Sequence, residues 1–528
     1  MITIELNESN FEYDIHSLVK AFYPEHDVLV KEGSREDFPE SMFHMRVAYD
    51  ENEISIAFEQ DGAEVLSGTV RVRPEDRKET KNQLKQRLYE LLSEYSGQNL
   101  PWGTLTGIRP TKIPMAMLEE GKTDDEIRTY MKETYFASDA KIELALDVAK
   151  REMELLSRID YEDGYSLYVG IPFCPSTCAY CSFTSYPLGR WASRMDEYLD
   201  ALERELEFTA EACRDKYLNS IYIGGGTPTS LEPEQLERLI TKIGECFHLF
   251  DANGNIVYGG LVQEDGTMMP GISAGFCIPD LSDIHPKNHL LEFTVEAGRP
   301  DSITEAKLQV LKKHNISRIS INPQTMKEET LRIIGRRHTV QQTREAYALA
   351  RKLGFDNINM DLIVGLPGES IEDVRRTMEE LQTMQPDNIT VHSLAIKRAA
   401  RLRMQQEEFE AFTMENTWET IQLTADYCAQ MGLEPYYLYR QKNMAGNFEN
   451  VGYAAPGKAG VYNILIMEEK QTIMALGAGA TTKVVFGHGE RIERAGNVKD
   501  IINYLERIDE MIDRKRDLLQ KTQADAVR

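Results

Sequence analysis

Three cysteines in one short segment constrain this chain more than any other feature. Cys174, Cys178 and Cys181 follow the spacing C-x3-C-x2-C and place three of the seven cysteines within eight residues. Three thiolates this close can ligate three irons of a 4Fe-4S cluster, and because the usual ligand set is four cysteines, one iron stays open to another ligand. The alternative is a zinc site, but zinc sites usually pair one C-x2-C unit with a second Cys or His pair. The remaining cysteines show no such spacing: Cys213, Cys246, Cys277 and Cys428.

The length and charge of the chain exclude several classes of protein. A chain of 528 residues predicts two or three domains. No apolar run approaches the roughly 18 residues that cross a bilayer, and the first residues lack the pattern of a signal peptide. We therefore expect a cytoplasmic monomer without a membrane span, where thiols stay reduced. The 60 basic and 86 acidic residues give a net charge of -26, which argues against nucleic acid as a partner.

Residues 1–150 are predicted to form an N-terminal α+β module with a helical connector. Alternating apolar residues at 45–49, 54–58 and 65–72 predict an antiparallel sheet, and a helix is expected at 78–95. Helices at 123–133 and 138–157 then lead to the next domain. The Gly- and Pro-punctuated segment at 100–110 is interpreted as a packed connector, with ligand contact as the alternative.

Residues 151–403 are predicted to form a partial (β/α)6 barrel, which makes the chain an α/β protein. Strands are expected at 165–170, 220–223, 291–296, 317–321, 357–363 and 388–392, with helices between them. Such alternation favours a parallel sheet, because each crossover needs a helix to return the chain. Barrels of this kind carry their chemistry at the C-terminal ends of the strands, and the cysteine segment follows the first strand.

Two other regions are predicted around this barrel. Residues 251–289 interrupt the alternation, and we expect a surface insertion with a hairpin formed by 256–258 and 260–263, or alternatively a lid over the site. Residues 404–528 are expected to form a small C-terminal module covering one side of the barrel. Within it, segments 462–467 and 472–475 are predicted to pair as a hairpin.

A run of glycines follows the second predicted strand. Gly224, Gly225 and Gly226 precede Thr227 and Pro228, and glycine lets the backbone approach a ligand closely. Alone, the run would indicate a tight turn. Together with the cysteine motif, it resembles the glycine motif of the radical S-adenosylmethionine (SAM) enzymes. In that superfamily the open iron chelates the amino and carboxylate groups of SAM, and an electron from the cluster cleaves SAM to a 5'-deoxyadenosyl radical.

A narrower resemblance rests on several motifs together. The segments 168–174, 224–228, 335–338 and 359–367, with Glu296 and Gln324, resemble the oxygen-independent coproporphyrinogen III oxidase family. The N-terminal module and residues 439–442 resemble its HemZ-type branch, the coproporphyrinogen dehydrogenases. The resemblance implies an oxidoreductase that decarboxylates coproporphyrinogen III to protoporphyrinogen IX in porphyrin and haem biosynthesis. It also implies a porphyrinogen substrate and an electron donor that the sequence does not identify.

The same resemblance implies roles for individual residues. Cys174, Cys178 and Cys181 would hold the 4Fe-4S cluster, and Tyr168 would be a catalytic residue facing the substrate. The residues expected to bind SAM are Gly225, Gly226, Thr227, Glu296, Gln324, Arg336 and Asp361. A tetracarboxylate substrate calls for basic partners, and the candidates are Lys397, Arg398, Arg401, Arg440 and Lys442.

Two positions depart from the pattern of the dedicated oxidases. Gly170 stands where they have His, and Phe183 stands where they have a fourth cysteine. The Phe is shared with haem-chaperone relatives, so a haem-binding chaperone or another tetrapyrrole-handling radical SAM protein is the alternative function. A transfer-RNA modifier is a third class, which the acidic charge disfavours.

Overall fold

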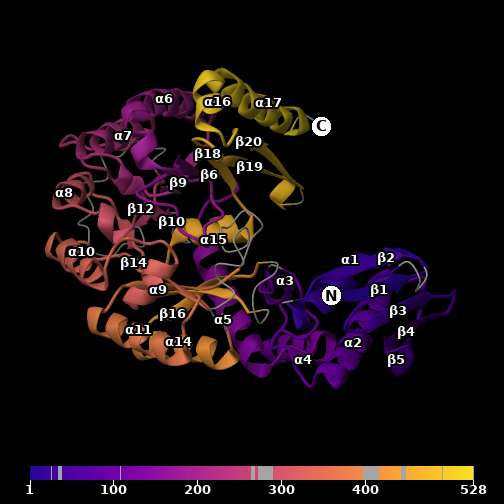
Figure 1. Cartoon of the computed structure of the whole chain (residues 1–528). Coiled ribbons are helices and arrows are strands. Elements are labelled where there is room, and N and C mark those ends of the chain that lie inside the picture. The colour runs from indigo at the N-terminus through magenta and orange to yellow at the C-terminus, as the bar shows by residue number, and fades with distance from the viewer. Residues whose placement is uncertain are drawn as a thin grey trace.

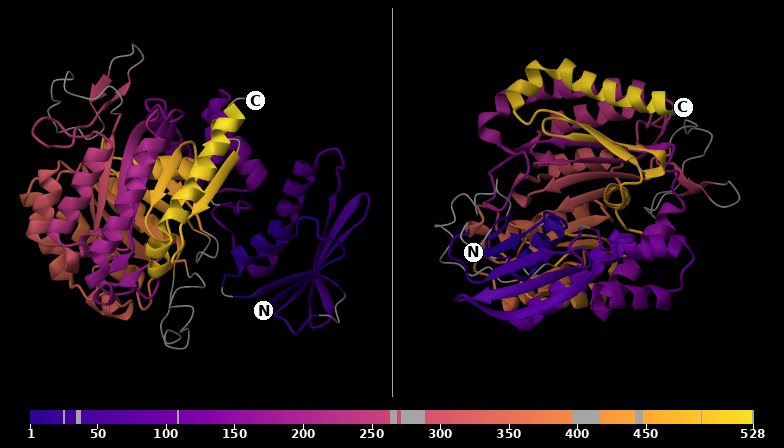
Figure 2. Two further views of the ribbon diagram at one scale, coloured as in Figure 1. Left: turned by 90° about the horizontal axis from the view of Figure 1, so that it is seen from above. Right: turned by 90° about the vertical axis from the view of Figure 1, so that its right-hand side faces the viewer.

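The computed structural model describes residues 1–24, 26–33, 38–107, 109–262, 268–270, 289–395, 416–441, 448–489 and 491–526. Two bodies are visible in Figure 1, a small N-terminal one and a larger one in which helices curve around a sheet. Figure 2 shows the N-terminal body beside the larger one rather than over its sheet. The two bodies have separate hydrophobic cores.

The N-terminal body is a five-stranded sheet with two helices. Its strand order is β2-β1-β3-β4-β5, in which β1 pairs in parallel with β2 and β3, and the remaining pairs are antiparallel. Apolar side chains of both helices and of the strands form one core. The elements are β1 (Ile2–Leu6), α1 (Glu12–Phe22), β2 (Val28–Glu32), β3 (His44–Tyr49), β4 (Glu53–Gln60), β5 (Ala63–Arg71) and α2 (Arg77–Ser96).

Three connector helices pack against the larger body rather than the N-terminal sheet. They are α3 (Lys112–Glu119), α4 (Asp124–Tyr135) and α5 (Asp139–Leu156). Trp102, Ile127 and Ile142 belong to the large core. The segment 100–107 is thus a packed connector, as expected from its Gly and Pro content, with the Trp102 side chain fully buried.

The larger body contains the six predicted parallel strands in chain order. The sheet runs β16-β17-β15-β14-β13-β12-β9-β6-β18-β19-β20, and its parallel part spans β15 to β18. The predicted α/β partial barrel is therefore confirmed, with β18 as a seventh parallel strand. The six expected strands are β6 (Gly164–Ile171), β9 (Tyr217–Gly225), β12 (Glu292–Gly298), β13 (Arg318–Ile321), β14 (Ile358–Val364) and β15 (Asn388–Ser393).

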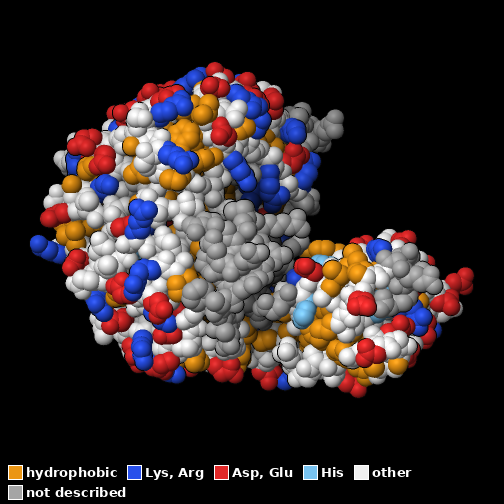
Figure 3. Space-filling view, viewed as in Figure 1, with side chains coloured by type: hydrophobic (Ala, Val, Ile, Leu, Met, Phe, Trp, Pro, Cys, Tyr) orange, Lys and Arg blue, Asp and Glu red, His pale blue; other side chains and the backbone are white. Residues whose placement is uncertain are grey.

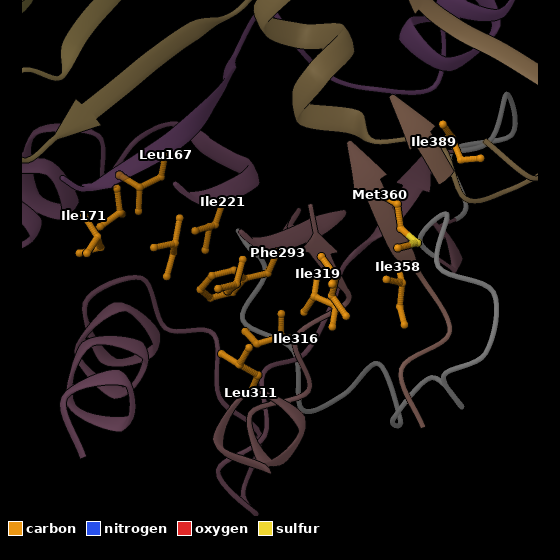
Figure 4. Packing of buried hydrophobic residues seen from close by; sticks show 14 of the residues in the cluster. Leu167, Ile171, Ile221, Phe293, Leu311, Ile316, Ile319, Ile358, Met360 and Ile389 are labelled. Carbon is orange, nitrogen blue, oxygen red and sulfur yellow. The ribbon is translucent and has the colours of Figure 1, made fainter. Parts of the chain in front are cut away.

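Amphipathic helices cover the outer face of this sheet, as Figure 1 shows. Each buries one apolar stripe on the strands, and Figure 4 shows Leu311 of α8 close to Phe293 and Ile319 of the sheet. Capping boxes begin α7, α10 and α11 and satisfy backbone donors there. The helices are α6 (Met195–Ala212), α7 (Pro233–Cys246), α8 (Glu305–Lys313), α9 (Glu328–Ile333), α10 (Val340–Lys352) and α11 (Ile371–Met384).

The C-terminal residues extend the same sheet at both edges. Beyond β15 lie the antiparallel β17 (Asn450–Ala454) and β16 (Glu434–Tyr439), which follow α14 (Trp418–Gln430). Beyond β6 lie β18 (Thr472–Leu476), β19 (Thr481–Phe486) and β20 (Arg491–Gly496). The helices α16 (Ile501–Glu506) and α17 (Ile508–Ala526) end the chain.

The predicted hairpin of 462–467 with 472–475 is wrong. Val461–Glu468 is helix α15, and β18 pairs with β6 instead. A short apolar run cannot by itself distinguish strand from buried helix. The tertiary reason for the helix is Glu292 of β12, whose carboxylate accepts the N–H groups of Val461 at 2.7 Å and Tyr462 at 3.4 Å. A buried carboxylate at a helix N-terminus stabilises that helix.

The insertion after α7 is described only in part. The predicted pairing of 256–258 with 260–263 is wrong: strand β10 (Gly260–Val262) pairs with β11 (Met268–Pro270), and Ile256 forms only an isolated bridge with Phe250. The prediction of a lid, and Cys277, lie outside the described residues.

Candidate functional site

One cavity lies where the parallel strands end. It holds about 1100 Å3 of space not occupied by protein atoms, its open mouth included. Its lining comes from the carboxyl ends of β6, β9, β12, β14 and β15 and from the loop after β13. Of the eleven site residues predicted from sequence, ten line it: Cys174, Cys178, Cys181, Gly225, Gly226, Thr227, Glu296, Gln324, Arg336 and Asp361.

The three cysteines of the loop after β6 are free thiols at one side of this cavity. Burial raises the pKa of Cys174 to about 11 and also raises the pKa of Cys181. Iron binds the thiolate form, so cluster binding releases protons here. Among the described residues no three Cys, His, Asp or Glu side chains converge on a point suited to one metal ion.

Arg299 binds Ser176 in the cysteine loop, and this residue was not predicted from the sequence. Its Nη1 donates to the backbone oxygen of Ser176 at 2.9 Å and to the Ser176 hydroxyl at 2.8 Å, and lies 4.0 Å from the Cys178 sulfur. Its Nε and Nη2 pair with Asp301 at 2.9 and 2.7 Å. A fixed cation beside three thiolates lowers the cost of gathering negative charge. The available signal in the sequence was the position of Arg299 directly after the third predicted strand.

The glycine segment is a close backbone contact rather than a plain turn. A Cβ at Gly226 would lie 2.7 Å from the Phe173 carbonyl oxygen and 3.0 Å from the Cys174 sulfur. Gly225 has φ +110°, which favours glycine. The N–H groups of Gly226 and Thr227 already donate to the carbonyls of Ile171 and Phe173 at 2.9 and 2.8 Å. The segment therefore offers acceptors and close approach, which suits a ligand amino group.

Glu296 is a carboxylate whose protonation changes near neutral pH. Burial is the main cause that raises its pKa to about 7, and nearby Asp361 raises it further. The Tyr222 hydroxyl donates to it, as does the Gly225 N–H, and both favour the charged form. The site thus places a partly buried acceptor beside the glycines.

Two buried amide oxygens at the cavity could accept hydrogen bonds from a ligand. The Gln324 Oε1 and Asn322 Oδ1 atoms lack a hydrogen-bond partner within the described structure, and both residues line the cavity. Gln324 has φ +68°, a costly conformation for a residue other than glycine, and its backbone is bonded to β14 on both sides. Such unpaired buried acceptors cost free energy unless a ligand donates to them.

Arg336 joins the cysteine loop to the strand ends. It donates to the Tyr180 hydroxyl at 3.0 and 3.2 Å and to the Asn322 carbonyl at 2.6 Å. It is 7% exposed, so its charge is held in place and its remaining N–H groups can face a bound carboxylate.

Asp361, His392 and Tyr439 form the opposite wall. The Asn359 amide donates to Asp361 at 2.7 Å, and the His392 Nε2 lies 4.0 Å from the same carboxylate. Burial lowers the pKa of His392, whose Nδ1 is 3.4 Å from the Tyr439 hydroxyl. Sequence reasoning missed His392 and Tyr439, although His392 ends the sixth predicted strand.

The other sequence candidates lie elsewhere. Tyr168 is not in the lining; it stacks with Tyr222 and Tyr462, at ring distances of 6.3 and 6.4 Å, behind the glycines. Arg440 is buried, donates to the Leu105 carbonyl at 2.6 Å and so ties the connector to β16. The remaining basic candidates lie outside the described residues: Lys397, Arg398, Arg401 and Lys442.

The residues present fit a 4Fe-4S cluster with SAM. Three thiols offer cluster ligands, a glycine cradle and unpaired acceptors suit an amino group, and Asp361 can accept from two hydroxyl groups at once. The fold and this site define a radical SAM protein, and the Radical SAM superfamily model matches residues 168–381. Proteins of this superfamily use a 4Fe-4S cluster and SAM, and these are the cofactors of the chain.

Similar proteins define the family more narrowly. The chain is 38% identical over 447 residues to the oxygen-independent coproporphyrinogen-III oxidase-like protein HemZ of Bacillus subtilis (strain 168), covering 84% of this chain and 82% of that protein. The chain belongs to this oxygen-independent coproporphyrinogen III oxidase-like family. It is also 28% identical to the heme chaperone HemW of the same organism, covering 64% of this chain and 76% of that protein.

The structure of coproporphyrinogen III oxidase (HemN) from Escherichia coli is also similar. It matches with a TM-score of 0.48 at 20% identity, covering 68% of this chain and 72% of that one. Within the described residues, no helix combines the length and apolar character needed to cross a bilayer.

Proposed function

We propose that this chain is a cytoplasmic, monomeric radical SAM oxidoreductase that converts coproporphyrinogen III to protoporphyrinogen IX in haem biosynthesis. The observation that carries the proposal is the cavity at the strand ends, in which the candidate cofactor-binding residues share one space with an open mouth. The 38% identity to the HemZ protein supports the same reaction. The cluster and SAM, when bound, supply a group that abstracts hydrogen atoms.

The residues of the chain would bind and orient the cofactors and shield them from water. Cys174, Cys178 and Cys181 would hold the cluster, while Glu296 and the Gln324 oxygen would accept from the SAM amino group. Asp361 would bind the ribose hydroxyls. Tyr168, which stacks on Tyr222 and Tyr462, would support the glycine segment from the interior of the barrel.

The reaction removes one hydrogen atom from each of two propionate side chains. Each substrate radical then loses carbon dioxide and gives one electron to a one-electron carrier, which leaves a vinyl group. Phe183 stands at the mouth of the cavity with 72% of its surface exposed. An exposed aromatic ring there suits contact with a flat tetrapyrrole.

Anaerobic incubation of the cluster-loaded protein with SAM, coproporphyrinogen III and dithionite, which supplies the electron for SAM cleavage, tests the proposal. We expect protoporphyrinogen IX, carbon dioxide and 5'-deoxyadenosine, with one 5'-deoxyadenosine for each vinyl group formed. The matched control is Cys246→Ser, which changes a cysteine outside the motif and should leave the yield unchanged, whereas Cys181→Ser should abolish it. Formation of 5'-deoxyadenosine without any porphyrin product would contradict the assignment of coproporphyrinogen III as the substrate.

A haem-binding chaperone is the second candidate, and Phe183 is the observation that favours it. The aromatic ring replaces the fourth cysteine of the oxidases and lies exposed at the cavity, and HemW relatives match the chain. Stoichiometric, stable haem binding that Phe183→Ala weakens, with no turnover of coproporphyrinogen, would support the chaperone instead.

A further inference from the structure

A second cavity lies on the other side of the cysteine loop. Its lining includes Pro175, Ser176 and Thr177, the three residues that follow Cys174, together with residues from α9 to the start of α10. Arg336 lines both this cavity and the cofactor cavity. Only one layer of protein therefore separates the cluster ligands from this outer surface.

Two exposed cations line this cavity, and two more are close to lining residues in the chain or through a hydrogen bond. Arg332 and Arg337 line it, and Arg190 follows Pro187, another lining residue, in the short helix Leu188–Arg190. The backbone of Lys499 joins them, because its carbonyl accepts the Tyr186 hydroxyl at 3.0 Å. All four side chains are exposed. We call Arg190, Arg332, Arg337 and Lys499 the outer basic surface.

These charges are not used to hold the fold. Within the described residues none of the four forms an ion pair with a carboxylate, and the Nε of Arg332 donates only to the backbone oxygen of Glu328 at 3.3 Å. The Glu328 carboxylate accepts the Val340 N–H at 2.7 Å and so serves the start of α10. Most other arginines of the described residues pair with Asp or Glu, and Figure 3 shows basic and acidic side chains interspersed on one face.

The chain as a whole carries a net charge of -26, which makes the local excess of cations at this point distinctive. A positive area on an acidic molecule steers a negatively charged partner to one place. Beside it, Tyr186 and Trp191 contact edge to face at 5.7 Å and are partly exposed. Aromatic residues and arginines are the residues enriched where proteins bind one another.

We propose that the outer basic surface docks an acidic one-electron carrier protein that reduces the cluster through the cysteine loop. One electron passes from the reduced carrier to the oxidised cluster, so the carrier is oxidised, the cluster is reduced, and no bond forms or breaks. The proposal rests on the cofactors of the superfamily and not on the porphyrinogen substrate. It therefore stands or falls separately from the proposed reaction.

The test variant reverses two charges, Arg332→Glu with Arg337→Glu. The matched control is Arg375→Glu with Arg376→Glu, which changes the net charge equally at two exposed arginines of α11. The first measurement is calorimetric binding of oxidised plant-type ferredoxin, an acidic low-potential carrier, to the cluster-free protein at low and high salt. We expect the test variant to bind about tenfold more weakly at low salt and the control to bind as the unaltered protein does.

The second measurement is 5'-deoxyadenosine formation from SAM by the cluster-loaded protein, driven in turn by reduced ferredoxin, dithionite and free reduced flavin mononucleotide. We expect the test variant to lose about tenfold in the ferredoxin-driven rate only, and the loss to disappear at high salt. Failure of the unaltered protein to bind ferredoxin, or equal ferredoxin binding and rate in both variants, would overturn the proposal. A loss confined to the flavin-driven rate would also overturn it, because the surface would then serve a small anion.

Discussion

Glu296 combines a charge that we propose to bind SAM with a cost in stability. It lies partly buried between the glycine segment and Tyr222, and burial raises the pKa of its carboxyl to about 7. Near neutral pH both protonation states are populated. Only the charged state can pair with the ammonium group of a ligand, so the same burial that makes the contact strong also makes it depend on pH.

We expect SAM to bind more weakly as the pH falls through 7, because protonated Glu296 loses its charge. Glu296→Gln should lower the affinity by about tenfold and flatten this dependence. Calorimetric titration of the cluster-loaded protein with SAM at pH 6.0 and 7.5 (roughly one-half to one pH unit either side of the pKa) measures both effects. A Gln variant that keeps the unaltered affinity and slope would exclude Glu296 from the amino-group contact.

The same variant should stabilise the protein without cofactors at alkaline pH. A carboxyl with a raised folded-state pKa contributes stability that is full below its unfolded value, near 4.5, and is lost as the pH rises through 7. Gln stays neutral, so we expect it to raise the free energy of unfolding by about 1–3 kcal/mol at pH 8 and to change it little at pH 5. Urea unfolding at the two pH values measures this change in free energy. Equal effects of the substitution at both pH values would contradict a raised pKa for Glu296.

Gly226→Ala should disturb the cysteine loop directly. The added Cβ would overlap the Phe173 backbone and the Cys174 sulfur, and relieving such an overlap costs about 1–3 kcal/mol. We expect lower iron and sulfide content after reconstitution, measured per chain. The control is Gly107→Ala, where the Cβ meets nothing within 4 Å, and full cluster content in both variants would show that the loop adapts.

At the scale of elements, one buried ion pair joins the connector to the barrel. Lys141 of α5 pairs with Glu449, just before β17, and the Trp102 Nε1 donates to the same carboxylate at 2.7 Å. The side chains of Lys141 and Glu449 are 3% and 0% exposed. A buried pair of this kind matters most when one partner is removed, since the other charge is then left without compensation.

Lys141→Met should therefore cost about 3–5 kcal/mol in the free energy of unfolding, because the buried Glu449 carboxylate loses its ion-pair partner and, among the described residues, keeps only the charge of Arg440 nearby. Arg128→Met is the control, since Arg128 pairs with Asp124, Asp125 and Glu143 at the surface, where such pairs contribute little to stability. Urea unfolding compares the two, and the double variant Lys141→Met with Glu449→Gln should recover part of the loss. Similar small costs for both single variants would mean that the Glu449 carboxyl group is uncharged in the folded protein.

At the scale of the whole molecule, two cores divide the chain at a different place from the predicted boundary at residue 150. The N-terminal core draws on β1 to β5 with α1 and α2, whereas the connector helices α4 and α5 contribute to the barrel core. A region with its own core and few ties to its neighbour can fold alone.

We thus expect a fragment of residues 1–98 to fold independently. It should show a cooperative thermal transition by circular dichroism and resist proteolysis, since the buried residues of its core, Leu100 apart, lie within that range. The comparison is a fragment of residues 1–156, whose connector helices would lack their barrel partners and should be cleaved first. A fragment 1–98 without a cooperative transition would show that the sheet depends on the barrel.

Much of this molecule was determined by sequence alone, because the signals are local. The three cysteines and the glycine run are short motifs, and apolar periodicity repeats six times in strands and helices that the structure contains. Parallel strands bring their carboxyl ends to one edge, so ten residues spread from Cys174 to Asp361 could be expected in one place. Their roles in binding stay predictions.

Only the tertiary structure decided which side chains stand beside those motifs. Arg299, His392 and Tyr439 belong to no short motif, and they lie at the cavity because separate strands end there. Residues 462–467 form a helix because Glu292, distant in sequence, caps it, and Arg440 holds the connector because Leu105 lies within reach. Such contacts join residues far apart along the chain, so no spacing within the sequence could show them.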